Sequence, residues 1–192
     1  MRSALTGLLA LLCLLVSACG SDGDDPEFHG KVLDNPYQVP DTPLTDTEGE
    51  PFSLAADTDK RLTLVFFGYT NCPDICPTVM GNIAVAMTRL DAADREQVDV
   101  VFVTTDPARD SEQVLRDYLD HLDSTFIGLT GDLDTIADVG DALAIGVDKV
   151  DPGGHTTATM AVDIADESPV YWDQETSAAQ FASDIHSLLE EE

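Results

Sequence analysis

Two β-prone runs of mostly apolar residues constrain the fold of this chain more than any other feature of its sequence. They lie at Leu62–Phe67 and Val98–Thr104, and apolar residues at helical spacing fill the segment from Val79 to Leu90 between them. A strand that is apolar on both faces is typical of the interior of a sheet covered by helices. Two such strands on either side of a helical segment therefore predict a parallel βαβ core.

The remaining segments extend this core into one α/β domain. A hairpin is expected at residues 42–54, where a Glu-Gly pair favours the turn, and a short strand at 126–129. Asp110 and Gln113 resemble a capping box before the next helical segment. The predicted fold is a central mixed β-sheet flanked by helices, with an N-terminal β-hairpin and an antiparallel edge made by a late hairpin. The further helices are expected at 114–122, 133–144 and 178–189, and the late hairpin at 159–172.

The first 18 residues are typical of an export signal. A positive start at Arg2 precedes an uncharged, mostly apolar run from Ala4 to Val16, which is shorter than the ~20 residues of a membrane-spanning helix. The small residues directly before Cys19 resemble a bacterial lipobox, which implies cleavage before Cys19 and lipidation of that cysteine. An ordinary signal peptide with a coincidental cysteine is the alternative.

These features divide the chain into a lipoprotein signal peptide at 1–18, a lipidated acidic tether at 19–36 and a folded domain at 37–192. The expected location is the cell membrane, with the domain on its extracytoplasmic face. The formal net charge of −28, from 9 basic and 37 acidic residues, argues against nucleic acid as a partner. The same acidity is typical of a saline habitat or of an acidic secreted protein, and both interpretations stay open.

Only two of the four cysteines are expected to remain as thiols. Cys13 leaves with the signal peptide and Cys19 carries lipid, which leaves Cys72 and Cys76 at C-x-x-x-C spacing. The pair lies where the first buried strand gives way to a helix, and Pro77 is tolerated in a first helical turn. A helix N-terminus lowers thiol pKa values, and four-residue spacing places both side chains on one helical face. The two sulfurs are therefore expected to form a disulfide or to hold one metal ion.

The histidines narrow the choice of metal. Two soft thiolates select Cu(I), zinc or iron–sulfur, and a structural zinc site needs four protein ligands. His155 lies in a glycine-flanked polar loop at 151–157, which makes it the strongest candidate for a further ligand. His121 and His186 fall in helical patterns and His29 in the tether, so we expect these three to be spectators. Two thiolates and one imidazole suit copper better than structural zinc.

The segment around the cysteines also carries a family signature. Residues 66–77, FFGYTNCPDICP, resemble the signature of the Sco/SenC family of copper-binding thioredoxin-like proteins. Residues 104–110, TTDPARD, and 128–131, GLTG, resemble two further segments of that family, and the likeness extends over roughly residues 40–190. The resemblance implies a thioredoxin-like fold and one bound copper ion, Cu(I) or Cu(II).

Carried over residue by residue, the resemblance makes Cys72, Cys76 and His155 the copper ligands. It implies a role in delivering copper to, or keeping reduced, the CuA centre of cytochrome c oxidase, so the subunit that holds this centre is the expected partner. The family usually has Asp directly before the ligand histidine, whereas this chain has Gly154. We therefore expect a looser orientation of His155.

Two classes of function use the same thiol pair. The first is a membrane-anchored copper metallochaperone, which is a binding and transfer protein rather than an enzyme. The second is a thiol–disulfide oxidoreductase that keeps partner cysteines reduced. His155 separates them, because copper binding requires it and thiol exchange does not. Asp106 and Arg109 either support the metal site or shape a turn and helix cap, and Asp74 either attracts the cation or is simply solvated.

Two further functions fit the cysteines less well. A peroxiredoxin-like site has the pattern P-x-x-x-T-x-x-C, but Phe66 stands where the proline would be and Thr70 lies two residues before Cys72. A structural disulfide staple at this spacing closes a very short loop, which adds little stability.

Overall fold

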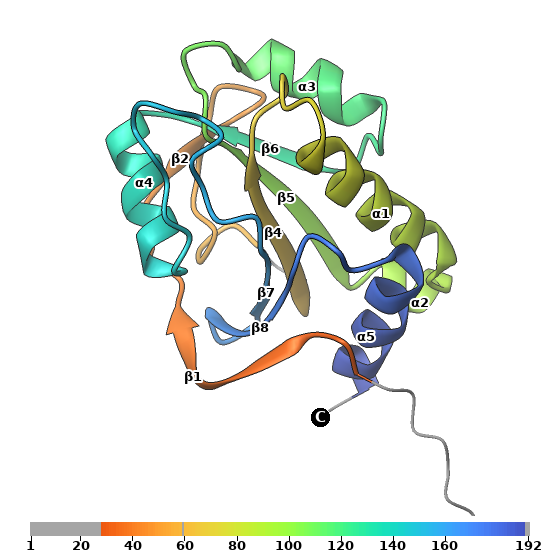
Figure 1. Ribbon diagram of the computed structural model, residues 1–192. Helices are drawn as coiled ribbons and strands as arrows, with labels where there is room; N and C mark the ends of the chain where they lie inside the picture. Colours follow the sequence, from red (N-terminus) through yellow and green to blue (C-terminus); the bar gives the residue numbers. More distant parts are fainter. Residues whose placement is uncertain (1–27, 59, 191–192) are drawn as a thin grey trace, which may run out of the picture.

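Eight strands form one sheet across residues 28–58 and 60–190, the part of the chain that the computed structural model describes (Figure 1). Their order across the sheet is β1-β8-β7-β4-β5-β6-β2-β3. β4, β5 and β6 are parallel, as the apolar runs predict, and β7 pairs antiparallel with β4, which confirms the mixed sheet. The strands are β1 (Lys31–Gln38), β2 (Leu44–Asp46), β3 (Pro51–Phe52), β4 (Leu62–Gly68), β5 (Val98–Thr104), β6 (Ile127–Thr130), β7 (Thr159–Asp163) and β8 (Glu167–Trp172).

Helices cover both faces of the sheet. α1, α3 and α5 contribute buried side chains to a cluster on one face, whereas α4 packs on the other (Figure 1). The helices are α1 (Ile75–Arg89), α2 (Ala92–Arg95), α3 (Glu112–Asp120), α4 (Leu133–Ala142) and α5 (Ala178–Glu190). α2 is a single turn that apolar spacing does not reveal, and Asp91 caps it by accepting a hydrogen bond from the N–H of Asp94. Within the described residues, no helix has the length and apolar character needed to cross a membrane.

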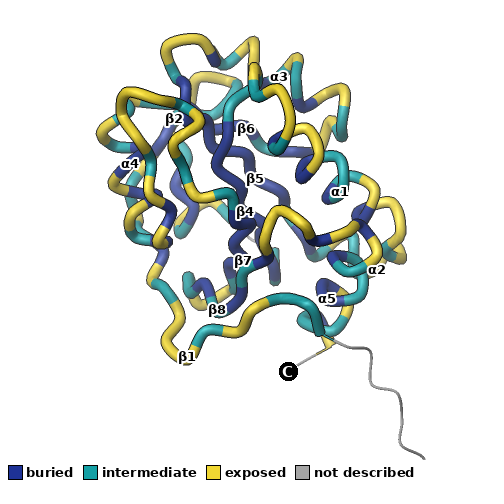
Figure 2. Tube along the Cα trace, viewed as in Figure 1, coloured by how far each residue is buried: buried dark blue, intermediate teal, exposed yellow. Residues whose placement is uncertain are grey.

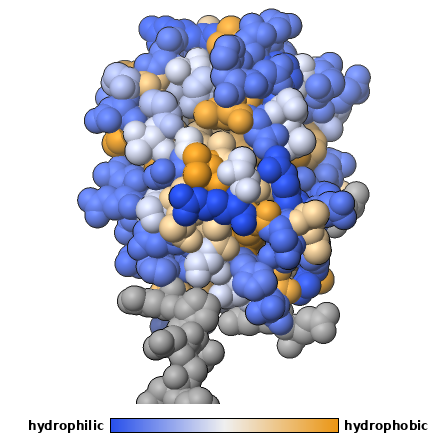
Figure 3. Space-filling view, turned by 90° about the vertical axis from the view of Figure 1, so that its right-hand side faces the viewer, coloured by the Kyte–Doolittle hydropathy of each residue, from blue (hydrophilic) through white to orange (hydrophobic). Residues whose placement is uncertain are grey.

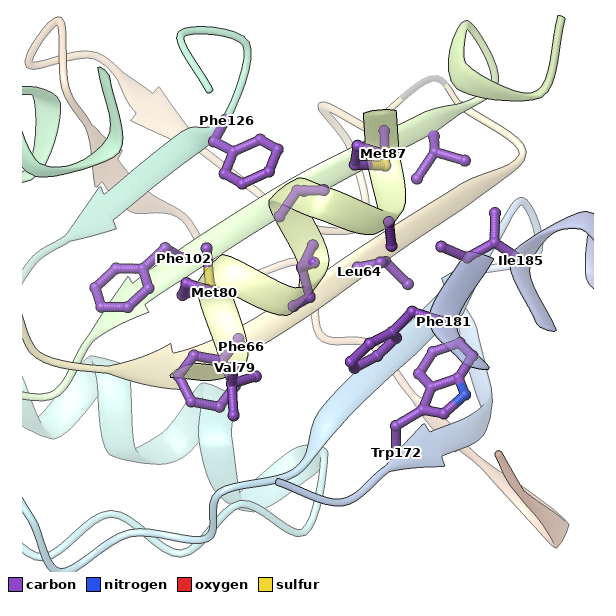
Figure 4. Close-up of a cluster of buried hydrophobic side chains, with 14 of the residues drawn as sticks. Leu64, Phe66, Val79, Met80, Met87, Phe102, Phe126, Trp172, Phe181 and Ile185 are labelled. Atoms are coloured by element: carbon purple, nitrogen blue, oxygen red, sulfur yellow. The ribbon is translucent and has the colours of Figure 1, made fainter. Parts of the chain in front are cut away.

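Alternation along β4 divides the core between the two faces of the sheet. Leu64 and Phe66 belong to the cluster under α1 and α5, and Val65 belongs to the cluster under α4. All three are 0% exposed, and the central strands are the most buried part of the chain (Figure 2). Trp172 and Phe181 pack against each other in the first cluster, with their ring centroids 5.3 Å apart (Figure 4). The face that α1, α2 and α5 turn outward is mostly hydrophilic (Figure 3).

The predicted N-terminal hairpin is confirmed, but one strand precedes it. β2 and β3 pair antiparallel, and Gly49 takes a φ of +83° in the turn. β1 pairs with β8, so the late hairpin is not the edge of the sheet, and residues 31–36 belong to the sheet rather than to the tether. The sequence conceals β1 because most of its side chains are exposed and its register shifts between Val32 and Tyr37. The signal peptide and Cys19 lie outside the described residues.

A buried carboxylate on α5 holds the first described residues. Asp184 is 0% exposed and accepts hydrogen bonds from the backbone N–H groups of His29 at 3.0 Å and Gly30 at 2.7 Å. The indole N–H of Trp172 donates to the same carboxylate at 2.8 Å. His29 therefore belongs to the folded domain and not to the predicted tether.

The predicted capping box at Asp110 is wrong. The residue that caps α3 is Ser111, whose side chain accepts a hydrogen bond from the N–H of Val114 at 3.4 Å. Gln113 donates instead to Asp117 along the helix surface at 2.7 Å. Asp110 turns inward and is 0% exposed. Two neighbouring residues that both suit an N-cap cannot be told apart by composition alone.

Candidate metal centre

The sheet topology brings the cysteines and His155 to the same edge of the molecule. The parallel strands β4, β5 and β6 all end there, and Cys72 follows shortly after the end of β4 (Figure 1). β7 runs in the opposite direction, so its first residue, Thr159, pairs with Phe66 near the end of β4. His155 lies just before β7 and therefore arrives at the edge where the cysteines lie. The carboxyl ends of parallel strands are where α/β folds place their sites.

The cysteine loop, residues 69–76, carries the chain from β4 into α1. The N–H of Cys72 donates to the carbonyl of Tyr69 at 3.1 Å, which closes a turn. α1 begins at the end of this loop, as expected, and Asp74 at its N-cap makes no capping hydrogen bond through its side chain. The N–H of Cys76 instead donates to the sulfur of Cys72 at 3.4 Å. This sulfur therefore takes the place of a capping acceptor at the positive end of the helix.

Both cysteines are free thiols, but their surroundings differ. Cys76 is 0% exposed and packs over Gly68, where an added β-carbon would lie 2.9 Å from its sulfur. The end of β4 therefore needs a glycine for the buried sulfur to fit. Cys72 is only half-buried and reaches the surface. Asp74 between them is exposed, which agrees with the solvated role expected as one of its two interpretations.

The two thiols also differ in pKa. Burial raises the pKa of Cys76 to about 12, and its hydrogen bond with Cys72 acts in the same direction. Burial also acts to raise the pKa of Cys72, but hydrogen bonds from the N–H groups of Asp74, Ile75 and Cys76 and from the Cys76 thiol outweigh it. The pKa of Cys72 therefore lies below its ordinary value. The sulfur of Cys72 therefore forms a thiolate more readily than the buried sulfur of Cys76.

His155 lies beside the cysteine loop, where it contacts Tyr69 rather than forming a metal-binding group with the two sulfurs. Its ring meets Tyr69 edge-on with the ring centroids 6.5 Å apart, and its Nδ1 lies 3.0 Å from the carbonyl oxygen of Thr156. Tyr69 is also close to Cys72: burial raises the pKa of the tyrosine, and the thiol adds to this effect. Among residues 28–58 and 60–190, no three His, Cys, Asp or Glu side chains are arranged to hold a metal. The cysteines are thus brought together, and His155 contacts Tyr69 instead.

The histidine loop, residues 146–157, is closed by hydrogen bonds within itself. The N–H of Asp148 donates to the carbonyl of Gly154 at 2.9 Å, and the N–H of Gly154 donates to that of Asp151 at 2.8 Å. An added β-carbon at Gly154 would lie 2.7 Å from the β-carbon of Asp148, so the loop closes in this way only with glycine there. These contacts close the loop, and the looser orientation of His155 as a ligand, which we expected from Gly154, stays a prediction.

The Asp-Pro-x-Arg-Asp segment shapes a turn after β5. Arg109 Nη1 donates to Asp106 Oδ2 at 2.7 Å, and the backbone N–H groups of Arg109 and Asp110 both donate to the carbonyl of Asp106 at 2.9 Å. The side chain of Arg109 is 67% exposed. These contacts favour the turn-shaping role for Asp106 and Arg109 over direct support of a metal.

Four residues near the site were not predicted to be part of it, namely Tyr69, Thr105, Asp110 and Tyr118. The hydroxyl of Tyr118 is buried and has no hydrogen-bond partner within the described part of the chain. Burial raises the pKa of Tyr118, and the thiol of Cys76 adds to this effect. The aromatic residue before the cysteines and the TTDPARD segment were the available signals, but neither indicates which side chains turn inward.

The other three histidines are engaged elsewhere. His29 Nδ1 lies 3.2 Å from Asp184 Oδ1, and His186 Nδ1 lies 2.7 Å from Asp94 Oδ2. His121 is exposed at the end of α3. That these three histidines are not ligands stays a prediction.

Comparisons with known proteins agree on one family. The SCO1/SenC family model matches residues 33–190. A Stutzerimonas stutzeri protein named for copper binding is 37% identical over 140 residues, which cover 72% of this chain and 68% of that protein. Curated relatives from Rickettsia, two yeasts and Arabidopsis also match, and this chain spans less than two thirds of the length of each of them.

Solved structures share the fold. Apo Sco1 from Thermus thermophilus superposes with a TM-score of 0.74 at 29% identity, covering 84% of this chain and 97% of that one. Copper-bound ScoI from Bradyrhizobium japonicum gives 0.63 at 28% identity, covering 80% and 98%. BsSco, described as a member of the Sco family of cytochrome c oxidase assembly proteins, gives 0.67 at 20% identity, covering 83% and 99%, and supports the fold alone. The expected thioredoxin-like fold is thereby confirmed.

Proposed function

Because this chain belongs to the SCO1/SenC family, we propose that it is a membrane-anchored copper metallochaperone that helps to assemble the CuA centre of cytochrome c oxidase. The observation that carries the proposal is the free thiol pair at the start of α1, where the backbone nitrogen of Cys76 lies 3.4 Å from the sulfur of Cys72. Adjacent thiolates are soft ligands that select Cu(I). Copper is the cargo here: the chain binds it and passes it on.

The unequal thiols suggest an order of binding. Cys72 is half-buried and has the lower pKa, so it meets the ion first. Cys76 then releases its proton as it coordinates, because a thiol binds metal as a thiolate. His155 is the proposed third ligand, and its imidazole suits Cu(II) as well as Cu(I). Its ring contacts Tyr69 in this structure, so its binding to the ion would require a local shift of the histidine loop or of that tyrosine.

The proposal includes the anchor and the compartment. Lipidation of Cys19 would hold the domain at the extracytoplasmic face of the membrane, where the CuA-bearing subunit of the oxidase would be its partner. Thiols outside the cytoplasm become oxidised unless they are kept reduced. A disulfide between Cys72 and Cys76 offers no thiolate to copper, so loading would follow reduction.

A second candidate function is thiol–disulfide exchange, which the unequal burial of the two sulfurs favours. The thiolate of Cys72 would attack a partner disulfide and release one partner thiolate, which takes up a proton. Cys76, after losing its proton, would then attack the sulfur of Cys72 in the mixed disulfide, which breaks the bond to the second partner sulfur and releases it as a thiolate that takes up a proton. The partner gains two electrons and two protons, and this chain ends with a Cys72–Cys76 disulfide.

The test is a copper titration of the reduced full chain in detergent, followed by absorbance. We expect one equivalent of Cu(II) to bind with thiolate-to-copper charge-transfer bands, and both C72S and C76S to abolish them. H155A should shift or remove the bands. H121A is the matched control, because it removes an exposed imidazole on α3.

Two results would contradict this function. Failure of the reduced protein to bind copper stoichiometrically would reject the metallochaperone proposal and favour thiol exchange. Bands that are identical in H155A and in wild type would remove His155 from the site. Reduction of a model protein disulfide by wild type and H155A at equal rates would then support the second candidate.

A further inference from the structure

One short segment after β5 touches both loops of the candidate site. Residues 104–110 run from the last residue of β5 to two residues before the start of α3. The N–H of Thr105 donates to the carbonyl of Gly68 at 2.6 Å, which extends the pairing of β5 with β4 by one step. One side chain of the segment bonds to each loop: Asp110 to the cysteine loop and Thr105 to the histidine loop. It is therefore placed to set the distance between them.

Asp110 holds the cysteine loop. Its Oδ2 accepts hydrogen bonds from the N–H of Thr70 at 2.9 Å and from the hydroxyl of Thr104 at 2.7 Å, and its Oδ1 accepts one from the hydroxyl of Thr70 at 2.6 Å. The carboxylate is 0% exposed, so these three bonds offset the cost of its burial. Thr70 lies two residues before Cys72. The buried carboxylate thus fixes the approach to the first sulfur.

Thr105 holds the histidine loop. It is 1% exposed, and its hydroxyl donates to the carbonyl of Pro152 at 2.9 Å. Pro152 lies three residues before His155 and is on the same closed loop. Most hydrogen bonds of the histidine loop are made within the loop. The bond from Thr105, at the end of a central strand, therefore fixes the position of the loop relative to the sheet.

We propose that Thr105 is a positioning residue for His155, and that with Asp110 it makes residues 104–110 the spacer between the thiol pair and the histidine. The inference rests on the copper function proposed above. Without the hydroxyl of Thr105, the histidine loop samples more positions, and the imidazole reaches the metal less often. The thiol pair is held separately and keeps its geometry.

The test compares the full chain with T105V, which is isosteric but has no hydroxyl, and with T105S, which restores the hydroxyl. In the metal-free protein we expect T105V to speed amide hydrogen exchange at Asp148 and Gly154 roughly fivefold, the size expected for one neutral hydrogen bond. In copper titrations we expect Cu(II) to bind T105V about fivefold more weakly, with altered charge-transfer bands. T105S should match wild type in both measurements.

The two readouts separate this inference from the function on which it rests. Unchanged exchange in T105V overturns the inference whatever copper does. Faster exchange with unchanged Cu(II) binding and bands also overturns it, because the loop is then held for a reason unrelated to the metal. If wild type binds no copper, the proposed function fails, and with it any positioning of a ligand. The exchange data then show only whether Thr105 holds the loop.

Discussion

The cysteine loop and the histidine loop meet at one edge of the sheet, but they are held in opposite ways. The cysteine loop is fixed by a central strand, a helix and the buried carboxylate of Asp110. The histidine loop lies on the surface, is closed by its own backbone and is joined to the sheet by Thr105. The cysteine loop is therefore held in one conformation, whereas the histidine loop can change its conformation at a small cost in free energy. Such a division suits the capture and release of copper proposed above.

The sharpest test of this comparison is the reactivity of the two thiols. With a pKa of about 12, Cys76 is almost wholly protonated at pH 8, whereas the lowered pKa of Cys72 raises its thiolate fraction above that of an ordinary cysteine. We expect iodoacetamide to modify Cys72 at least several hundredfold faster, with the rate rising with pH up to the pKa of Cys72. Mass spectrometry of the reduced protein, with C72S and C76S as controls, measures both rates. Equal rates would show that the cysteine loop is not fixed.

The next largest effect is expected from the carboxylate that fixes the cysteine loop. D110A removes three hydrogen bonds and leaves buried donors unpaired, so we expect the free energy of unfolding to fall by roughly 2–4 kcal/mol in urea titrations. D110N keeps the shape and one oxygen acceptor, and it should lose about 1 kcal/mol. If D110A unfolds like wild type, the buried network does not stabilise this loop.

A smaller effect is expected in the histidine loop, where a matched pair of glycines allows a direct control. G154A places a β-carbon 2.7 Å from the β-carbon of Asp148, whereas Gly146 in the same loop has open space around it. We expect G154A to speed amide exchange within the loop and to cost about 1 kcal/mol in global stability, because the loop can open locally. G146A should leave loop exchange near the wild-type rate. Equal behaviour of the two variants would mean that the closed loop is not maintained in solution.

The smallest effect should come from a pair outside both loops, which gives the baseline for the others. A hydrogen bond to Asp94 raises the pKa of His186, partly opposed by burial and supported by Glu190. The stabilisation is fully present below the unfolded pKa of ~6.5 and is lost as pH rises through the higher folded pKa. Because the histidine is half exposed, H186A should cost at most about 0.5 kcal/mol at pH 5.5 and less at pH 8.5. Urea titrations at both pH values measure this, and the opposite pH trend would contradict it.

The parts of the fold that bury alternating or periodic apolar residues were predictable from the sequence. β5 has the predicted bounds, and β4 and α5 each extend one residue beyond theirs, because their apolar patterns leave little choice of register. β1 was not predictable in this way, since its contribution is backbone pairing at an exposed edge. α2 is too short to show a period.

The site was predictable in its chemistry and less so in its geometry. The C-x-x-x-C spacing at a strand–helix junction predicts that the two sulfurs lie close together, and they do, but the expected shared helical face is wrong. Cys76 lies in the first turn of α1, whereas Cys72 lies in the loop two residues before the N-cap Asp74. The contact of His155 with Tyr69 depends on where a surface loop packs, which no local pattern encodes. Asp110 looks like a helix cap in sequence because Asp suits both a cap and a buried acceptor, and only the tertiary neighbours Thr70 and Thr104 decide between them.

The carboxylate of Asp184 has a mechanical consequence. Its hydrogen bonds connect the backbone at residues 29 and 30 to α5 and to Trp172 at the end of β8. A force applied to the chain ahead of this point would therefore enter the domain through β8 and α5. β8 is separated from β4 by β7, so a load that enters the sheet passes through β8 and β7 before it reaches the strand that carries the cysteine loop. Within the sheet, two strands therefore lie between a pull at residue 29 and the strand that leads to the two sulfurs.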